Sequence, residues 1–231
     1  MAYTTINKST DHFTTHLYSG NDSTNNQTSL GMTPDLVWVK CRNNSTPSHY
    51  WVDKVRGDKK YISSNRQDAE ATDSNTFDLV SGGFNLAGGN GWTNVTGRNY
   101  VAWNWKAGNS AGSANTDGTI NSTVSVNTTA GFSIVKYTGG GSAGTVGHGL
   151  SAAPEVVILK SISGSDVWAT YHKGIDATAP ADYFIQLQST AARTNNADFF
   201  SDTLPTNQVF SIGANSAVSN NGSSFIAYCF A

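Results

Sequence analysis

The sequence predicts an all-β protein made of two tandem β-sandwich domains of jelly-roll or lectin-like type, related by internal duplication. Three observations predict this fold: a neutral polar composition, segments that recur at a nearly constant spacing, and turn signals between short apolar runs. Ser, Thr and Asn make up about a third of the 231 residues, while only 13% are charged. Thr, Val and aromatic residues favour strands, and the helix formers Leu, Glu, Lys and Gln are scarce.

The recurring segments follow one another in the same order in both halves. Met32–Lys40 has the pattern of a turn followed by an apolar strand, and Ala152–Lys160 repeats it 120 residues later. Phe13–Tyr18 matches Phe132–Tyr137 at a spacing of 119. The spacing changes only slightly from one match to the next, as expected if insertions and deletions fall in loops between strands. We therefore interpret the halves as copies of one domain.

The last predicted strand is the most distinctive segment of each half. Tyr100–Trp105 (YVAWNW) matches Phe225–Phe230 (FIAYCF), and Gly83–Leu86 pairs loosely with Val209–Ile212. Side chains alternate between the two faces of a strand, so Cys229 takes the place of an Asn at a small-residue position. We expect this cysteine to serve packing.

The boundary between the repeats falls in a small, polar, Gly-rich segment. Residues 108–119, which include GNSAGSAN, are predicted to be a linker. This places domain one at 1–107 and domain two at 120–231, and each half is expected to fold when expressed alone. Arg66–Thr72 is the single segment with a helical pattern, and it would make barely two turns.

Charge and composition argue against several classes of protein. A net charge of -2 without a basic patch argues against nucleic-acid binding. No apolar run approaches the roughly 20 residues of a membrane span, and residues 1–13 lack the basic and apolar regions of a signal peptide. Cys41 and Cys229 match no zinc spacing and suit a reducing cytoplasm. No metal and no cofactor is predicted.

Residues that could carry chemistry are scattered along the chain. The sequence holds no G-x-S-x-G, H-E-x-x-H, C-x-x-C or phosphate-loop motif, so we do not predict an enzyme. A carboxylate pair for glycoside hydrolysis stays open as an alternative, because the two groups need not be close in the sequence. The charged stretch Val52–Lys60 (VDKVRGDKK) is expected to be a solvated loop.

Aromatic residues near predicted loops are better candidates for binding. A sugar is recognised by a flat apolar ring with neutral hydrogen-bonding groups around it, and tryptophans in loops rich in Asn, Thr and Ser would supply both. His49-Tyr50-Trp51 in the first half and Trp168, followed by Tyr171-His172, in the second half stand in comparable places. Core packing is the alternative, which we expect for Trp38, Trp103 and Trp105 and leave open for the three loop tryptophans. The candidate ligand-binding residues are His49, Tyr50, Trp51, Trp92, Trp168 and His172.

Motifs along the whole chain also resemble one family. The segments that carry the likeness include MAYTTINKS and HLYSGN near the start, PDLVWVK (34–40), YVAWNWKA (100–107), GFSIVKYTG (131–139) and FIAYCFA (225–231). They resemble a domain of unknown function common in structural proteins of marine bacteriophages. The resemblance implies a lectin-like β-sandwich of tail fibres and other virion-surface proteins, and it implies no catalytic residues. The heptads and collagen-like repeats of a fibre shaft are absent from the sequence.

The resulting hypothesis is a virion-surface structural protein, a tail-fibre or appendage component that contributes to host attachment by binding a glycan. Its expected partners are other virion proteins of the capsid, tail or fibre, a host-surface glycan and further copies of itself in a homo-oligomer. We expect synthesis in the host cytoplasm without a signal peptide and no membrane insertion. A capsid decoration or cement protein without a ligand is the alternative, and a glycan depolymerase is a third. Exposed loop tryptophans would favour glycan binding, whereas a flat apolar patch would favour docking.

Overall fold

A computed structural model describes residues 6–73, 77–88 and 91–231 of the chain. The chain divides into two compact units. Unit 1 comprises Met1–Ser64 and Glu70–Ala111, and unit 2 comprises Asn65–Ala69 and Gly112–Ala231. The main break falls inside the segment expected to be a linker, but five residues from the first half belong to the second unit.

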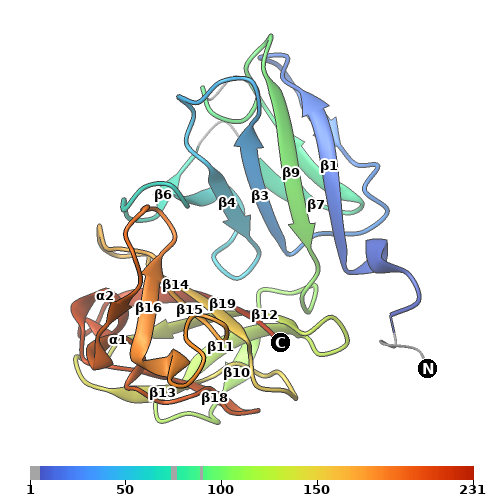
Figure 1. Ribbon diagram of the computed structural model, residues 1–231. Coiled ribbons are helices and arrows are strands. Elements are labelled where there is room, and N and C mark those ends of the chain that lie inside the picture. The colour runs from blue at the N-terminus through green and yellow to red at the C-terminus, as the bar shows by residue number, and fades with distance from the viewer. Residues whose placement is uncertain (1–5, 74–76, 89–90) are drawn as a thin grey trace. The chain divides into compact units, whose positions relative to one another are not determined.

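Unit 1 is built from short antiparallel strands. Its elements are η1 (Ser9–Asp11), β1 (Phe13–Ser19), β2 (Asn25–Gln27), β3 (Leu36–Cys41), β4 (Tyr50–Asp53), β5 (Lys60–Ser63), β6 (Ala71–Thr72), β7 (Phe77–Val80), β8 (Gly83–Leu86) and β9 (Asn99–Trp105). Within the described residues, one sheet has the order β1-β9-β3-β4-β5-β6 and a second has the order β2-β8-β7. Figure 1 shows β4, β3, β9 and β1 side by side.

Unit 2 has the same kind of architecture. Its strands are β10 (Ser113–Asn115), β11 (Ser122–Asn127), β12 (Phe132–Thr138), β13 (Gly144–Gly147), β14 (Val156–Ser161), β15 (Ala169–His172), β16 (Tyr183–Gln186), β17 (Thr194–Asn195), β18 (Val209–Ile212) and β19 (Ser224–Phe230). Its helical turns are η2 (Pro180–Asp182), α1 (Ala197–Phe200) and α2 (Ser216–Ser219). The large sheet has the order β10-β11-β12-β19-β14-β15-β16-β17, and β13 pairs with β18. The all-β prediction is confirmed.

The apolar runs predicted to be central strands lie inside the large sheets. β3 pairs with β4 on one side and β9 on the other, and β14 lies between β15 and β19. Leu36, Val37 and Val39 of β3 are buried, as are Val157 and Leu159 of β14, and the remaining apolar side chains of the two runs are partly covered. Side chains on both faces of each strand are thus at least partly removed from water. This explains the continuous apolar pattern of both segments.

The core of each unit lies on the small-residue face of its closing strand. β9 directs Tyr100 and Ala102 into the core of unit 1, and β19 directs Phe225, Ala227 and Cys229 into the core of unit 2. The packing prediction for Cys229 is confirmed: the side chain is fully buried, the cysteine is free, and burial raises the pKa of its thiol to about 12. A thiol held protonated in this way is a poor nucleophile.

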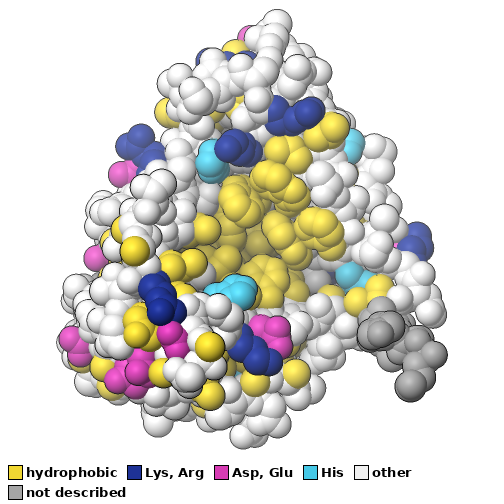
Figure 2. Space-filling model, viewed as in Figure 1, with side chains coloured by type: hydrophobic (Ala, Val, Ile, Leu, Met, Phe, Trp, Pro, Cys, Tyr) yellow, Lys and Arg dark blue, Asp and Glu magenta, His cyan; other side chains and the backbone are white. Residues whose placement is uncertain are grey.

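The expectation that Trp38, Trp103 and Trp105 fill the core of unit 1 is wrong. Side chains alternate along a strand, so when β9 turns its small residues to the core, its tryptophans lie on the opposite face. The three tryptophans are only half-buried. The ring centroid of Trp38 lies 5.0 Å from that of Trp103. Figure 2 shows hydrophobic side chains gathered over β3 and β9.

Two local predictions are also corrected. Arg66–Thr72 forms no helix: Arg66 lies in a bend, residues 67–70 have no regular secondary structure, and Ala71–Thr72 is β6. The expected linker contains β10, which pairs with β11.

The short helices α1 and α2 each begin after an asparagine whose side chain accepts a hydrogen bond from a backbone N–H of the first turn.

The charged stretch Val52–Lys60 is not simply a solvated loop. The side chains of Asp53 and Arg56 are fully buried, with Arg56 Nε 2.5 Å from Asp53 Oδ2. Arg56 Nη2 also donates to the carbonyl oxygen of Trp51 at 2.8 Å, and Nη1 lies 3.5 Å from Glu70 Oε2. A buried charge needs such partners, and the contacts of Arg56 with Asp53 and with the carbonyl oxygen of Trp51 stabilise β4 inside unit 1.

Candidate functional site

The predicted binding residues of β4 lie inside unit 1. Tyr50 is 1% exposed, belongs to the core, and stacks on Tyr61 with ring centroids 4.1 Å apart. Trp51 is also 1% exposed and lies opposite Trp38, with 4.9 Å between ring centroids. His49 is half-buried, and desolvation followed by the charge of Lys40 lowers its pKa. Tyr50 and Trp51 therefore present no ring face to a ligand.

Trp92 keeps part of its surface exposed, but it packs against the core of unit 1. It lies in the GGNGWTN segment, of which residues 89 and 90 are outside the described part of the chain. The half-buried ring keeps Trp92 as a candidate contact residue.

The two predicted binding residues of unit 2, Trp168 and His172, differ in exposure. Trp168 is fully buried, and its Nε1 donates to the carbonyl oxygen of Arg66 at 2.9 Å. His172, at the end of β15, is exposed, and its Nδ1 accepts a hydrogen bond from the backbone N–H of Gly174 at 2.9 Å. For Trp51 and Trp168 the sequence left core packing and ligand binding open, and in the structure both side chains are buried.

The two aromatic groups are not in comparable places either. Trp51 lies opposite Trp38 in the β3–β4 pair, whereas Thr170 lies opposite Ile158 in the β14–β15 pair. Because Trp38 and Ile158 occupy the same position of the repeated segment, Thr170 is the counterpart of Trp51. Trp168 stands two residues earlier, just before β15 begins. Sequence likeness between short aromatic stretches gave the wrong register here.

The structure reveals a pocket in unit 2 that the sequence did not predict. It has a volume of about 380 Å³ and is formed mainly by apolar side chains. Three of the five prolines of the chain line it. We call it the proline pocket. Its lining residues are Ala153, Pro154, Glu155, Tyr171, Lys173, Asp176, Ala177, Pro180, Leu204 and Pro205.

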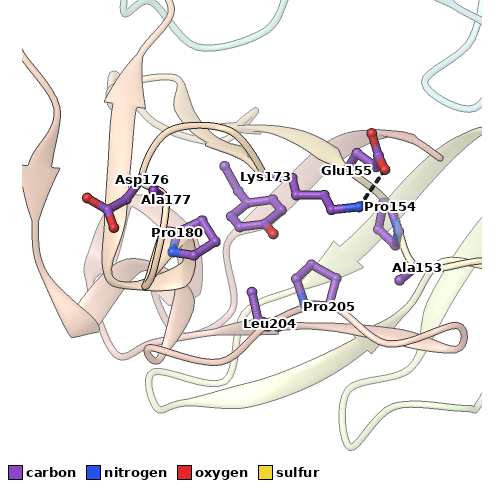
Figure 3. Close-up of a pocket in the computed structure, with 10 residues that line it drawn as sticks. Ala153, Pro154, Glu155, Lys173, Asp176, Ala177, Pro180, Leu204 and Pro205 are labelled. Carbon is purple, nitrogen blue, oxygen red and sulfur yellow. Dashed lines mark hydrogen bonds and ion pairs between the residues drawn. The ribbon is translucent and has the colours of Figure 1, made fainter.

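Several separate segments of unit 2 supply these residues. Pro154 and Glu155 come just before β14, and Tyr171 and Lys173 come from the end of β15 and the turn after it. Pro180 begins η2, where the fixed φ of proline suits the first position of a helical turn. Leu204 lies in the loop between α1 and β18 and is 54% exposed. Figure 3 shows these residues around one space.

An ion pair forms the polar part of the pocket. Lys173 Nζ lies 2.7 Å from Glu155 Oε1, and the backbone N–H of Lys173 donates to the carbonyl oxygen of Glu155 at 2.7 Å (Figure 3). The hydrogen bond and the opposite charge lower the pKa of Glu155 and raise that of Lys173. Both groups are therefore charged near neutral pH, one offering acceptors and the other donors.

Asp176 has a different task at the rim. Its Oδ1 accepts hydrogen bonds from the N–H groups of Thr178 and Ala179, at 2.9 and 3.0 Å, and its Oδ2 lies 2.8 Å from Arg193 Nη1. The backbone hydrogen bond from Thr178 is the main cause of its lowered pKa. In Figure 3 the carboxylate points away from Lys173. Asp176 thus fixes the loop that carries Pro180.

Tyr171 forms part of the apolar wall. Only 2% of its surface is exposed, its ring centroid lies 5.9 Å from that of Phe200, and burial raises the pKa of its hydroxyl.

The described residues contain no group of three or more His, Cys, Asp or Glu that could hold a metal ion. They also contain no helix long and apolar enough to cross a membrane.

One signal in the sequence could have pointed toward this site. Pro154, Pro180 and Pro205 all fall in the second half, next to turn segments, and Leu204 is an apolar residue in a polar stretch. Nothing in their spacing shows that they meet, because the contacts depend on how the loops between strands fold back.

Comparison with known proteins gives one match. A family model described as a domain of unknown function (DUF7483) matches residues 8–231. No curated protein and no solved structure matches the chain. The matched region includes most of both units. The chain belongs to the DUF7483 family.

Proposed function

We propose that this protein is a structural component of a virion surface that contributes to host attachment by binding a cell-surface glycan in the proline pocket. The pocket is the observation that carries the glycan part of the proposal. Its volume of about 380 Å³ is at the lower end of the range for small-ligand sites, which is roughly 300–1,000 Å³. The placement on a virion is supported by the motifs of the sequence that resemble phage structural proteins.

The chemistry of the pocket suits a sugar. The rings of Pro154, Pro180 and Pro205 and the side chain of Leu204 offer apolar surface for the C–H face of a pyranose ring. Prolines lose little side-chain entropy when a ligand orders them, so these contacts are made at low cost. The Glu155–Lys173 pair can accept from and donate to sugar hydroxyl groups, which orients the ring.

The charge balance of the pocket favours a neutral glycan. Glu155 and Lys173 cancel each other, and Asp176 is paired with Arg193. Long-range attraction for a charged ligand is therefore weak, and in a salt-rich medium it would be screened within about 3–8 Å. Apolar contacts and short hydrogen bonds retain their strength under such conditions.

We also propose that the two units arose by duplication of one domain. Main-chain hydrogen bonds at matched positions support this: the N–H of Asp35 donates to Trp105 O at 2.8 Å, and the N–H of Glu155 donates to Phe230 O at 2.7 Å. Each bond joins the start of a central strand to the end of the closing strand. The matched residues are those that the sequence repeat pairs.

Glycan-array screening of the full chain tests the binding function. We expect retention of neutral glycans, and Leu204→Asp is expected to weaken binding roughly tenfold or more by placing a charge on the apolar wall. Leu17→Asp is the matched control, because Leu17 is 56% exposed and belongs to unit 1. Equal binding by both variants, with thermal unfolding unchanged, would show that the glycan does not occupy the pocket.

Immunogold electron microscopy of intact phage particles tests the location. Label at the tail or fibre tips is the result expected for an attachment protein. Label over the head would instead identify a decoration protein, and particles without any label would contradict the virion assignment.

A structural subunit without a ligand is the second candidate function. The exposed side chains of Phe13 (38%) and Leu17 (56%) on β1 favour it, because they offer an apolar contact outside the proline pocket. An empty glycan array together with label over the head would select this function.

A further inference from the structure

β1 is a long edge strand of unit 1. It pairs with β9 on one side, and no strand of the described residues pairs with its other side. In unit 2, β12 occupies the corresponding position beside the closing strand β19. There, β11 covers the other edge of β12 along six residue pairs. Among the residues that the structure describes, the edge that is covered in unit 2 is thus open in unit 1.

The β1 edge lacks the usual features that prevent pairing. Natural edge strands are commonly short, bulged or protected by lysine or proline. β1 has seven residues, FTTHLYS, without lysine, proline or glycine. Phe13 and Leu17 expose large apolar side chains on it. By contrast, the edge strands β6, β10 and β17 have two or three residues each.

The backbone of β1 is oriented for pairing along this edge. Lys106 N–H donates to His12 O and Gly20 N–H donates to Arg98 O, each at 2.9 Å. These bonds set the alternation of the β1–β9 ladder, so the even-numbered residues of β1 bond toward β9. The N–H and C=O groups of Phe13, Thr15 and Leu17 consequently point to the open side.

We propose that a second copy of this chain pairs its β1 with this β1, antiparallel and centred on Thr15. In this register Thr15 faces Thr15, and Phe13 of each copy faces Leu17 of the other. Each of these pairs makes two backbone hydrogen bonds, because all three residues direct their backbone groups outward. Thr14 then faces His16, so no two groups with a fixed charge are opposed.

The sequences of the strands involved indicate that a second copy of β1 can pair with the open edge of β1. Unit 2 covers the corresponding edge with a strand of neutral, small and β-branched residues, STVSVN, and Val124 of that strand lies opposite Val135. β1 likewise contains no Lys, Arg, Asp or Glu and is compatible with itself across a two-fold axis, which yields a closed dimer. A net charge of -2 opposes association of two copies only weakly.

Charge-swap variants of the full chain test the register. Sedimentation over a wide range of concentrations should show a monomer–dimer equilibrium for the natural sequence. Thr15→Lys and Thr15→Glu should each weaken the dimer roughly tenfold or more, because two like charges then face each other. Thr15 is exposed, so both variants are expected to keep the fold. Mixing the two variants should restore dimers, because opposite charges then meet.

The controls separate this proposal from glycan binding. Leu17→Asp should weaken the dimer and Leu204→Asp should not, which is the reverse of their expected effects on glycan retention. A natural chain that stays monomeric at every concentration would overturn the proposal. Dimers that survive both Thr15 substitutions, or that fail to return when the two variants are mixed, would overturn it as well.

Discussion

The two units build their large sheets in the same order and differ at the edges. The order β1-β9-β3-β4-β5-β6 of unit 1 corresponds to β12-β19-β14-β15-β16-β17 of unit 2, where β10 and β11 extend the sheet further. The smaller sheets differ more: β7 lies beside β8, whereas α1 packs against β18. The shared part is therefore the closing strand with its neighbours, and the variable part is what surrounds it.

A buried tyrosine makes the same kind of long-range hydrogen bond in both units. The hydroxyl of Tyr18 donates to Thr93 O at 2.8 Å, and the hydroxyl of Tyr137 donates to Val218 O at 2.6 Å. Each tyrosine also stacks on an aromatic residue of the closing strand, with centroid distances of 5.1 and 5.2 Å. The match includes side-chain geometry as well as strand order.

One difference between the units lies at the proline pocket of unit 2. The carboxylate of Asp35 is buried in unit 1, where its Oδ2 accepts hydrogen bonds from the N–H groups of Ala107 and Asn109 at 2.7 and 3.0 Å. Its counterpart, Glu155, is exposed and pairs with Lys173 at the pocket. The same position is thus buried and bonded to backbone N–H groups in one unit and lines the proline pocket in the other.

The largest expected difference concerns the ends of β4 and β15. Asp53 and His172 hold the same register position, but Asp53 is buried against Arg56 and His172 is exposed. Asp53→Ala should lower the free energy of unfolding of unit 1 by about 3 kcal/mol, because it leaves a buried arginine with poorer pairing. His172→Ala should change the stability of unit 2 by less than about 0.5 kcal/mol.

Denaturant unfolding of the full chain with each substitution measures both effects. Equal losses would mean that the ion pair contributes little, and the contrast between these two positions would then be wrong.

A smaller, pH-dependent difference is expected at a lysine of the repeat. Lys40 is exposed, whereas its counterpart Lys160 is fully buried and its Nζ donates to the carbonyl oxygens of Ser161 and Gly164. Desolvation lowers the pKa of Lys160 from 10.5 to about 8, although the charges of nearby carboxylates oppose the shift. The neutral form is thus favoured more in the folded state than in the unfolded state.

The direction of the pH effect follows from this shift. Between about pH 8 and 10.5 the unfolded chain keeps a proton that folded Lys160 has released, so the free energy of unfolding should rise with pH. The rise is at most about 3 kcal/mol. Urea unfolding of the natural chain and of Lys160→Met across this range should show the natural chain gaining stability relative to the variant. Lys40→Met controls for losing a lysine at the same strand position, and a pH-independent difference for Lys160→Met would contradict the assignment.

The smallest expected effect tests whether the two units pack alike. A Cβ on Gly20 would lie 2.3 Å from Val95 O, and a Cβ on Gly139 would lie 2.5 Å from Asn220 O. Each contact is with backbone, which cannot move aside cheaply. Gly20→Ala and Gly139→Ala should therefore each lower stability by about 1–2 kcal/mol. Gly140→Ala is the matched control, because a Cβ there meets nothing within 4 Å. A clear effect at only one of the two matched glycines, measured by thermal unfolding, would argue against equivalent packing.

Local sequence patterns predicted much of the fold. Composition predicted the all-β class, and the apolar runs Leu36–Val39 and Val156–Leu159 predicted the central strands, because continuous apolar residues suit a strand that is covered on both faces. The repeat also paired segments that the structure places in corresponding registers. These features depend on residue type and short-range periodicity, which can be read along one segment.

The candidate site could not be predicted in this way. Alternation separates the two faces of β9, but only the packing of Tyr18 and Phe84 against Tyr100 and Ala102 decides that the small-residue face is the core one. Burial of Trp168 depends on contacts with distant parts of the chain such as Arg66.

The proline pocket is a further case, because it joins loops that are well separated in the sequence. The sequence by itself determined the all-β class and the central and closing strands, since these follow from local propensity and period. Which surfaces became core, pocket or open edge was decided only by the tertiary structure, because burial is a property of segments brought together in space.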